Sequence, residues 1–280
     1  MSSAKPIAIA IASGKGGVGK STVAVNLGVV LAQRGSRVGL LDADVYGPNC
    51  HIMLGVDRMP PSSGTRMNPA IAHGVRVMSM GFLVKPGQPL AWRGPMLHSA
   101  IRQFVNDVEW GDLDYLLVDL PPGTGDVSMT LAQLLPQAQF VIVTTPQQTA
   151  QKVARRSADM ANKVNLEVAG VIENMAGFVA PDGERYQIFG EGGGQELADE
   201  IGVPLIAKVP LTMPLREQAD AGVPLVISDP DDPAAQSIRQ AARGLIAIFP
   251  AELPMIQAEM PADAADADGP EPVGMTLPMA

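Results

Sequence analysis

Residues 14–22 read Gly-Lys-Gly-Gly-Val-Gly-Lys-Ser-Thr, and this stretch decides the fold class. It contains Gly14, four intervening residues, Gly19, Lys20 and Ser21, which is the spacing of a phosphate-binding loop. The apolar run 7–12 before it predicts a buried strand, and the apolar spacing over 21–34 predicts a helix. A glycine-rich turn between a strand and a helix directs backbone N–H groups toward phosphate oxygens.

The residue types of this loop predict that it binds ATP together with Mg²⁺. Lys20 would supply positive charge to the β- and γ-phosphates, and the Ser21 hydroxyl is a candidate Mg²⁺ ligand. A single glycine here would be an ordinary turn residue, but the complete pattern between a strand and a helix favours a phosphate site. The expected nucleotide-binding residues of the loop are Gly14, Lys15, Gly16, Gly17, Val18, Gly19, Lys20, Ser21 and Thr22.

Aspartates follow two further predicted strands, 37–41 and 115–118. Ligands of open α/β sheets bind at the carboxyl ends of the strands, where Asp42 and Asp119 would lie. These two carboxylates and Ser21 are therefore the candidate Mg²⁺ ligands, with Asp119 holding a water of the ion. An aspartate at a strand end can instead cap a helix, and that alternative stays open.

The rest of the chain alternates strands and helices. Residues 140–144, 168–172 and 204–207 predict strands, 94–108 predicts a helix, and 46–72 is expected to be irregular. This alternation implies right-handed crossovers and a mainly parallel sheet with helices on both faces. Residues 1–250 are thus expected to form one α/β domain of the P-loop NTPase class, and the acidic, Pro/Ala/Met-rich residues 251–280 a disordered tail.

Charge and cysteine usage limit the possible partners and location. A formal net charge of −9 argues against a nucleic-acid-binding surface. No run of about 18 apolar residues is present, so no membrane-spanning helix is expected. The single cysteine, Cys50, rules out a disulfide within the chain and fits a reducing compartment, so we expect a cytoplasmic protein.

The second lysine of the loop, Lys15, is typical of the deviant Walker A group, which includes MinD, ParA-like ATPases and the nitrogenase iron protein. Over about residues 7–249 the sequence further resembles the Mrp (ApbC-like) iron–sulfur cluster carrier ATPases. The segments that carry this resemblance are 42–49, 92–96, 110–115, 119–126, 173–175 and 188–190. A solvated surface lysine is the simpler interpretation of Lys15.

The resemblance implies a homodimer that binds ATP, hydrolyses it slowly and delivers a [4Fe–4S] cluster to apo-proteins. Lys15 would reach the phosphates of the partner subunit, and Asp44 would be the catalytic carboxylate. Asn174 would contact adenine, and a loop around Pro210 would flank the base. The same resemblance implies that residues 121–126 form a loop that senses the γ-phosphate.

The cluster site is where the sequence departs from this family. Members usually have Cys-x-x-Cys shortly after the 173–175 segment, but Ala180 stands at the first position and no cysteine follows. Asp182 is a hard ligand and a poor substitute for thiolate. Cys50 is interpreted as a buried structural cysteine, and the three histidines lack metal-ligand spacing. No iron–sulfur ligand is therefore identified.

Two other functions remain as alternatives. A MinD- or ParA-like scaffold, switched by nucleotide and free of metal clusters, would position or regulate a protein partner, and the missing cysteines favour it. A kinase-like phosphotransferase is the weaker alternative, because a monomeric kinase has no use for a lysine such as Lys15.

Overall fold

Residues 5–62, 64–83, 94–123 and 125–251 are described by the computed structural model, in which nine strands form one sheet. The strands are β1 (Ile7–Ala12), β2 (Val38–Asp42), β3 (Ala70–Ala72), β4 (Val75–Ser79), β5 (Tyr115–Asp119), β6 (Gln139–Thr144), β7 (Glu167–Val179), β8 (Arg185–Tyr186) and β9 (Leu205–Leu211). Their order is β3-β4-β2-β5-β1-β6-β7-β8, with β9 also paired to β7. All pairs are parallel except β3–β4 and β7–β8, which confirms the predicted α/β class.

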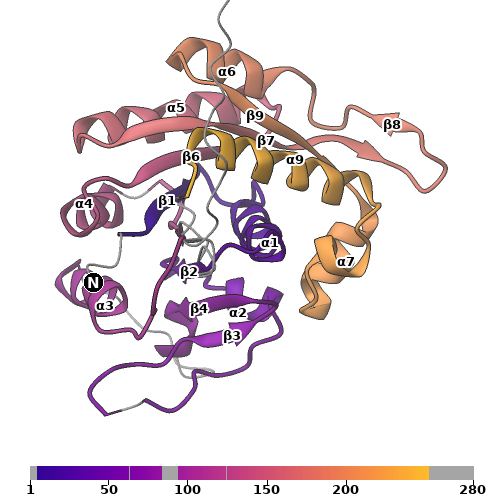
Figure 1. The fold of residues 1–280 in the computed structure, drawn as a ribbon. Coiled ribbons are helices and arrows are strands. Elements are labelled where there is room, and N and C mark those ends of the chain that lie inside the picture. Colours follow the sequence, from indigo (N-terminus) through magenta and orange to yellow (C-terminus); the bar gives the residue numbers. More distant parts are fainter. Residues whose placement is uncertain (1–4, 63, 84–93, 124, 252–280) are drawn as a thin grey trace, which may run out of the picture.

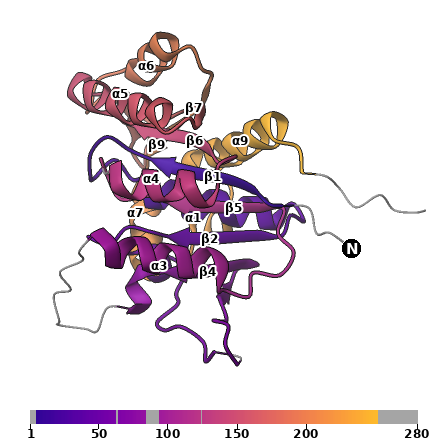
Figure 2. The same cartoon turned by 90° about the vertical axis from the view of Figure 1, so that its left-hand side faces the viewer.

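Helices cover both faces of this sheet (Figures 1 and 2). The helical segments are α1 (Lys20–Gln33), α2 (Cys50–Met53), the 3₁₀ turn η1 (Met80–Leu83), α3 (Gly94–Asn106), α4 (Gly125–Leu134), α5 (Gln148–Lys163), α6 (Gly193–Ile201), α7 (Met213–Ala221), α8 (Leu225–Ser228) and α9 (Pro233–Ile248). Helices α3, α4, α5 and α6 pack on one face of the sheet, whereas α1 and α9 pack together on the other. None of the helices in the described part of the chain is both long and apolar enough to cross a membrane.

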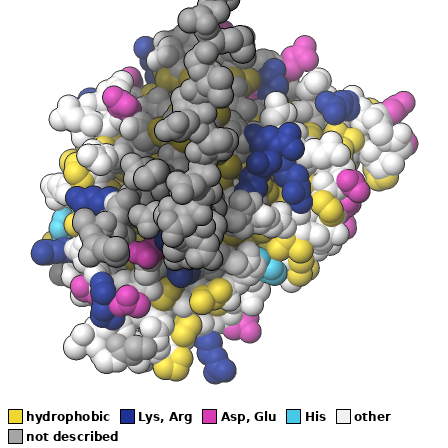
Figure 3. All heavy atoms as spheres, viewed as in Figure 1, with side chains coloured by type: hydrophobic (Ala, Val, Ile, Leu, Met, Phe, Trp, Pro, Cys, Tyr) yellow, Lys and Arg dark blue, Asp and Glu magenta, His cyan; other side chains and the backbone are white. Residues whose placement is uncertain are grey.

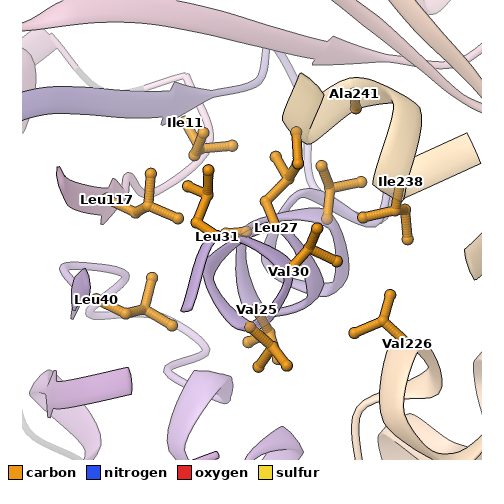
Figure 4. Packing of buried hydrophobic residues seen from close by; sticks show 14 of the residues in the cluster. Ile11, Val25, Leu27, Val30, Leu31, Leu40, Leu117, Val226, Ile238 and Ala241 are labelled. Atoms are coloured by element: carbon orange, nitrogen blue, oxygen red, sulfur yellow. The ribbon is translucent and has the colours of Figure 1, made fainter. Parts of the chain in front are cut away.

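The side chains of β1, a central strand, pack alternately against the helices on the two faces of the sheet. Ile9 and Ile11 face the α1 side, and the alanines that alternate with them face the α3–α4 side. Helix α1 is wrapped by apolar side chains from the sheet and from α8 and α9, and Leu27 and Leu31 are fully buried there (Figure 4). Truncating such a leucine to alanine costs about 2–5 kcal/mol of stability. This packing fixes α1 against the sheet, and the phosphate loop is therefore held between two rigid elements, β1 and α1.

The structure corrects the prediction that 46–72 is irregular, because this segment contains α2 and β3. Strand β4, which was not predicted, pairs with β3 through a two-residue turn. His73 and Gly74 in that turn have φ of 51° and 81°, as the tight turn of a β-hairpin requires. The predicted helix 94–108 ends at Asn106, and β7 and β9 run beyond the predicted 168–172 and 204–207.

Some predictions fall on residues outside the described ranges. They are the disordered tail from residue 252 onward, residues 92 and 93 of the 92–96 segment, and Thr124 of the 121–126 loop.

Candidate active site

The phosphate loop lies between the carboxyl end of β1 and the first turn of α1, as predicted. Gly17 and Gly19 have φ of 78° and 76°, a backbone region that favours glycine. Gly14 packs against the backbone of α5 at Val153, where a Cβ atom would clash. A cavity of about 190 Å³ opens over the loop, and its lining includes residues 15–22 and Asp44.

Lys20 and Asp119 form a buried ion pair within this site. Lys20 Nζ lies 2.6 Å from Asp119 Oδ1, and Ser21 Oγ donates to Asp119 Oδ2 at 2.6 Å. Burial lowers the pKa of Lys20, but the charge of Asp119 and the hydrogen bond to it outweigh this effect and leave that pKa raised. Lys20 is therefore a permanent cation, held by a carboxylate where the loop can present it to a phosphate.

Asp42 is buried beside this pair, and its carboxylate is already hydrogen-bonded by the protein. Oδ1 accepts the Asp44 N–H at 3.2 Å, and Oδ2 accepts the Cys50 N–H at 3.1 Å and the Ser79 hydroxyl at 2.9 Å. Burial, with the neighbouring charge of Asp119, raises the pKa of Asp42 to about 7. Asp42 therefore links β2, β4 and α2 behind Asp119.

Asp44 lies two residues beyond the end of β2 and borders the phosphate-loop cavity. Its Oδ1 accepts the N–H groups of Tyr46 at 3.0 Å and Gly47 at 3.3 Å, which fixes the carboxylate in a local turn. The turn brings a carboxylate to the side of the cavity facing the lysines.

Lys15 donates to Gln147 Oε1 at 2.9 Å, across 132 residues of sequence. Gln147 immediately precedes α5 and was missed in the sequence analysis. Its position just beyond the end of β6, at the same sheet edge as the loop, is the signal that could have identified it. Helix α5 thus contacts the loop twice, through Gly14 and at Lys15.

Asn174 reaches the phosphate loop from β7, and its Nδ2 donates to the Val18 carbonyl at 2.8 Å. The following residue, Met175, has φ of 56°, and the pairing of β7 with β9 is irregular after Asn174. The Asn174 Oδ1 atom is buried without a hydrogen-bond partner among the described residues. Asn174 therefore presents a free acceptor beside the loop.

Pro210 differs from its prediction, because it lies in strand β9 rather than in a loop. It lines a separate cavity of about 180 Å³ with Glu173 and Lys208, not the cavity over the phosphate loop. Because β9 pairs with β7 and Val209 is the partner of Asn174, Pro210 still lies near that asparagine.

The donor set around Asp119 fits a magnesium ion. Ser21 and Asp119 offer a hydroxyl and a carboxylate in direct contact, and these are the hard oxygen ligands that Mg²⁺ takes in nucleotide sites. Asp42, Cys50 and Asp119 place possible ligand atoms within 4.8 Å of one another, with Cys50 Sγ 3.4 Å from Asp119 Oδ2. Burial and the two carboxylates raise the pKa of this thiol, so it acts as a neutral neighbour rather than a ligand for a hard ion.

Comparison with known proteins assigns this loop and sheet to a family. The family model described as the NUBPL iron-transfer P-loop NTPase matches residues 6–246. The chain belongs to this family. The iron–sulfur cluster carrier protein of Synechocystis is similar to it, with 51% identity over 242 residues that cover 84% of this chain and 69% of that protein.

Solved structures agree with this assignment. A nucleotide-binding protein from Archaeoglobus fulgidus, in complex with ADP, is similar at a TM-score of 0.68 and 39% identity, covering 77% of this chain and 86% of that one. The septum site-determining protein MinD of Pyrococcus horikoshii, complexed with Mg-ADP, has a TM-score of 0.66 at 22% identity and covers 86% and 96% of the two chains. At that identity the MinD likeness concerns the fold alone.

Ala180, which stands where the resemblance implies the first cysteine of Cys-x-x-Cys, lies in the hairpin that β7 and β8 form. In the turn of this hairpin, the Ala180 N–H donates to the Glu184 carbonyl at 2.9 Å and the Gly183 N–H donates to the Ala180 carbonyl at 2.9 Å. Asp182 Oδ1 accepts the Glu184 N–H at 3.0 Å. The only cysteine, Cys50, is fully buried beside Asp119 instead. These residues do not fit an iron–sulfur cluster, which needs thiolate ligands.

The histidines make local contacts elsewhere. His51 Nδ1 lies 3.0 Å from Ser79 Oγ, and His98 Nδ1 lies 3.0 Å from Thr130 Oγ1. His73 is a turn residue. Among the described residues, none of the three joins a group of side chains spaced for a metal ion.

Proposed function

We propose that this member of the NUBPL family is a Mg²⁺-dependent ATPase that acts, as a homodimer, in the maturation of iron–sulfur proteins. One observation carries the proposal: Lys20, Ser21 and Asp44 line a single cavity over the phosphate loop, and the buried Asp119 accepts hydrogen bonds from Lys20 and Ser21. The ADP complex of the similar Archaeoglobus fulgidus structure supports a nucleotide at this position.

Binding would begin with an exchange of partners at Lys20. The loop N–H groups and Lys20 take the phosphates, and Asp119 gives up its ion pair with the lysine. Ser21 and Asp119 would hold Mg²⁺ with Asp42 behind them, and the bound ion supplies neutralising charge to the phosphate oxygens. The free Oδ1 of Asn174 would accept a hydrogen bond from the adenine amine, with Pro210 nearby.

Hydrolysis would depend on two further side chains. Asp44, fixed by its turn at the cavity edge, orients the attacking water toward the γ-phosphate. Lys15 leaves Gln147 and neutralises charge on the phosphates of the partner subunit, as an arginine finger does. The reaction is slow when turnover waits for two subunits to associate.

The partners we propose are a second copy of this chain and the apo-proteins or assembly proteins that exchange iron–sulfur clusters. The net charge of −9 disfavours nucleic acid. On the face shown in Figure 3, the basic side chains of the described residues include one local group and otherwise mix with acidic and hydrophobic ones. A single cysteine suits work in the reducing cytoplasm.

The hairpin without thiols favours a second candidate function. With Ala180 and Asp182 at the ligand positions, the chain would act as a nucleotide-switched scaffold that regulates a protein partner and carries no cluster. The same ATPase site serves either function, so the two differ in cargo only.

Anaerobic iron–sulfur reconstitution with a parallel ATPase assay separates these candidates. Wild type and Lys20→Ala would be compared for ATP turnover, and iron and sulfide would be counted for each dimer. Mg²⁺-dependent turnover that is lost in Lys20→Ala supports the ATPase, and unchanged turnover in that variant would refute it. Iron bound stoichiometrically and lost in Cys50→Ala supports direct carriage, whereas absence of iron beside intact ATPase activity supports the scaffold.

A further inference from the structure

An apolar groove lies at the end of the sheet where the parallel strands begin, remote from the phosphate loop. Its volume is about 630 Å³, within the range of about 300–1,000 Å³ in which proteins enclose small apolar groups. The ends of α3 and α4 and the starts of β1, β5 and β6 form its walls. The side chains that make it apolar include Val105, Trp110, Leu113, Leu134, Leu135 and Phe249.

Both ends of the described chain meet at this groove. Lys5 and Pro6 line it where β1 begins, and Phe249 lines it just after α9 ends. Figure 2 shows β1 starting and α9 ending on the same side of the molecule. Tyr115 Oη donates to the Phe249 carbonyl at 2.7 Å and accepts the Ala251 N–H at 3.3 Å, so the chain is anchored at the groove as far as residue 251.

The sequence that continues from this anchor begins with an apolar cluster. Residues 252–256 read Glu-Leu-Pro-Met-Ile, and 29 residues follow Ala251 in all. Five extended residues span about 17 Å, so Leu253, Met255 and Ile256 lie within reach of a groove whose wall includes Phe249. Residues 1–4, which precede Lys5, read Met-Ser-Ser-Ala and contain one large apolar side chain.

Charges at the rim are compatible with this acidic segment. Lys5 is exposed at the groove. The nearby acidic side chains Glu109 and Asp112 are paired with Arg66 at 2.9 Å and Arg37 at 3.7 Å. Their charge is thereby offset, which reduces repulsion of Glu252 and Glu259.

We propose that residues 253–256 of the same chain dock into this groove and cover it. Docking removes the apolar side chains of the segment and of the groove from water, which is the driving force. It fastens the C-terminal segment to the end of the domain opposite the ATP site. The inference does not depend on the proposed ATPase or on any cargo.

Trp110 provides a reporter, because it lines the groove and the sequence contains one other tryptophan, Trp92. In a Trp92→Phe background, the full-length triple variant Leu253→Ser, Met255→Ser, Ile256→Ser should show red-shifted Trp110 emission and stronger quenching by acrylamide. The matched control replaces three apolar residues at the far end of the same tail, Met275→Ser, Leu277→Ser and Met279→Ser, and should leave both signals unchanged.

A synthetic peptide of residues 252–262 should reverse the shift when it is added to the triple variant. Far-UV circular dichroism and the thermal unfolding midpoint serve as the folding controls for both variants. Equal quenching in the parent, the triple variant and the control would refute docking. A Trp110 signal that changes with protein concentration would also overturn the proposal, since it would indicate that the segment of a second copy fills the groove.

Discussion

At the residue scale, the site is defined by buried charges that the protein itself has paired. Asp119 accepts hydrogen bonds from Lys20 and Ser21 at 2.6 Å each, and the Cys50 thiol lies 3.4 Å from its Oδ2 atom. Asp42 is fully buried and receives three hydrogen bonds but no cation among the described side chains. Burial and the neighbouring charge of Asp119 therefore raise the pKa of Asp42 to about 7, so the Asp42 carboxyl group exchanges its proton near neutral pH.

This raised pKa predicts a pH-dependent stability that Asp42→Asn removes. The pKa of Asp42 is about 7 in the folded protein against 3.8 for the ordinary group, so the folded state binds the extra proton. The stability that Asp42 contributes is fully present below about pH 4 and is lost as pH rises through about 7. At about 1.4 kcal/mol for each unit of pKa difference, the total loss in the free energy of unfolding is about 4 kcal/mol. Urea unfolding of wild type and Asp42→Asn at several pH values measures the difference. A constant gap between the two proteins would contradict the assignment.

At the element scale, α5 is the helix on which the phosphate loop rests. The α5 backbone at Val153 meets Gly14, and Gln147 before the helix holds Lys15 at 2.9 Å. Gly125, at the start of α4, lies close to the side chain of Met160, which belongs to α5. A shift of α5 would therefore change its contacts with the phosphate loop and with α4 at the same time.

Gly14→Ala is predicted to destabilise the protein through this contact. The added Cβ would overlap the α5 backbone, which cannot move aside as a flexible side chain does, and such overpacking costs about 1–3 kcal/mol. Gly16→Ala is the matched control, since the nearest atom to its Cβ is Pro122 Cγ at 3.9 Å. Thermal and urea unfolding of the two variants tests the contact. If both variants were equally stable, the loop would not rest on α5 as described.

At the scale of the whole molecule, the two ends of the parallel strands have different tasks. The carboxyl ends gather the phosphate loop, Asp42, Asp44 and Asp119, and the opposite end gathers the two ends of the described chain, at Lys5 and Phe249, around an apolar groove. In the subunit by itself, Lys15 points to Gln147 of its own chain. A role for Lys15 at a second subunit therefore requires association.

Lys15→Ala is predicted to keep nucleotide binding and to lose ATP-dependent dimerisation. Lys20 and the loop N–H groups still hold the phosphates, whereas the charge offered to the partner is removed, which should lower turnover by about 10²–10³-fold. Light scattering with and without Mg-ATP, beside nucleotide titration, measures both properties. Gln147→Ala is the control, because it removes the hydrogen-bond acceptor of Lys15 but keeps the charge of the lysine. Normal turnover and dimerisation in Lys15→Ala would rule out a trans-acting lysine.

The sequence by itself determined the features that depend on local backbone chemistry. The strand, glycine turn and helix around residues 14–19 were predicted correctly, and Asp42 and Asp119, predicted to follow their strands, are the last residues of β2 and β5. These features are accessible because strand period, turn geometry and helix entry are set within a few residues. The departure at Ala180 and Asp182 was also visible from residue types alone. The β3–β4 hairpin was missed although its His73-Gly74 turn is local, since its strands are short.

Only the tertiary structure decided which of these groups touch. Lys20 meets Asp119 across 99 residues, Lys15 meets Gln147 across 132, and Asn174 meets Val18 across 156. Such contacts follow from the order of strands in the sheet, which places β5 and β6 on either side of β1. The burial that raises the pKa of Asp42, the thiol of Cys50 beside Asp119 and the groove at the opposite end have the same origin. Sequence periodicity shows which face of an element is buried, but the neighbours across that face are fixed by packing of the whole chain.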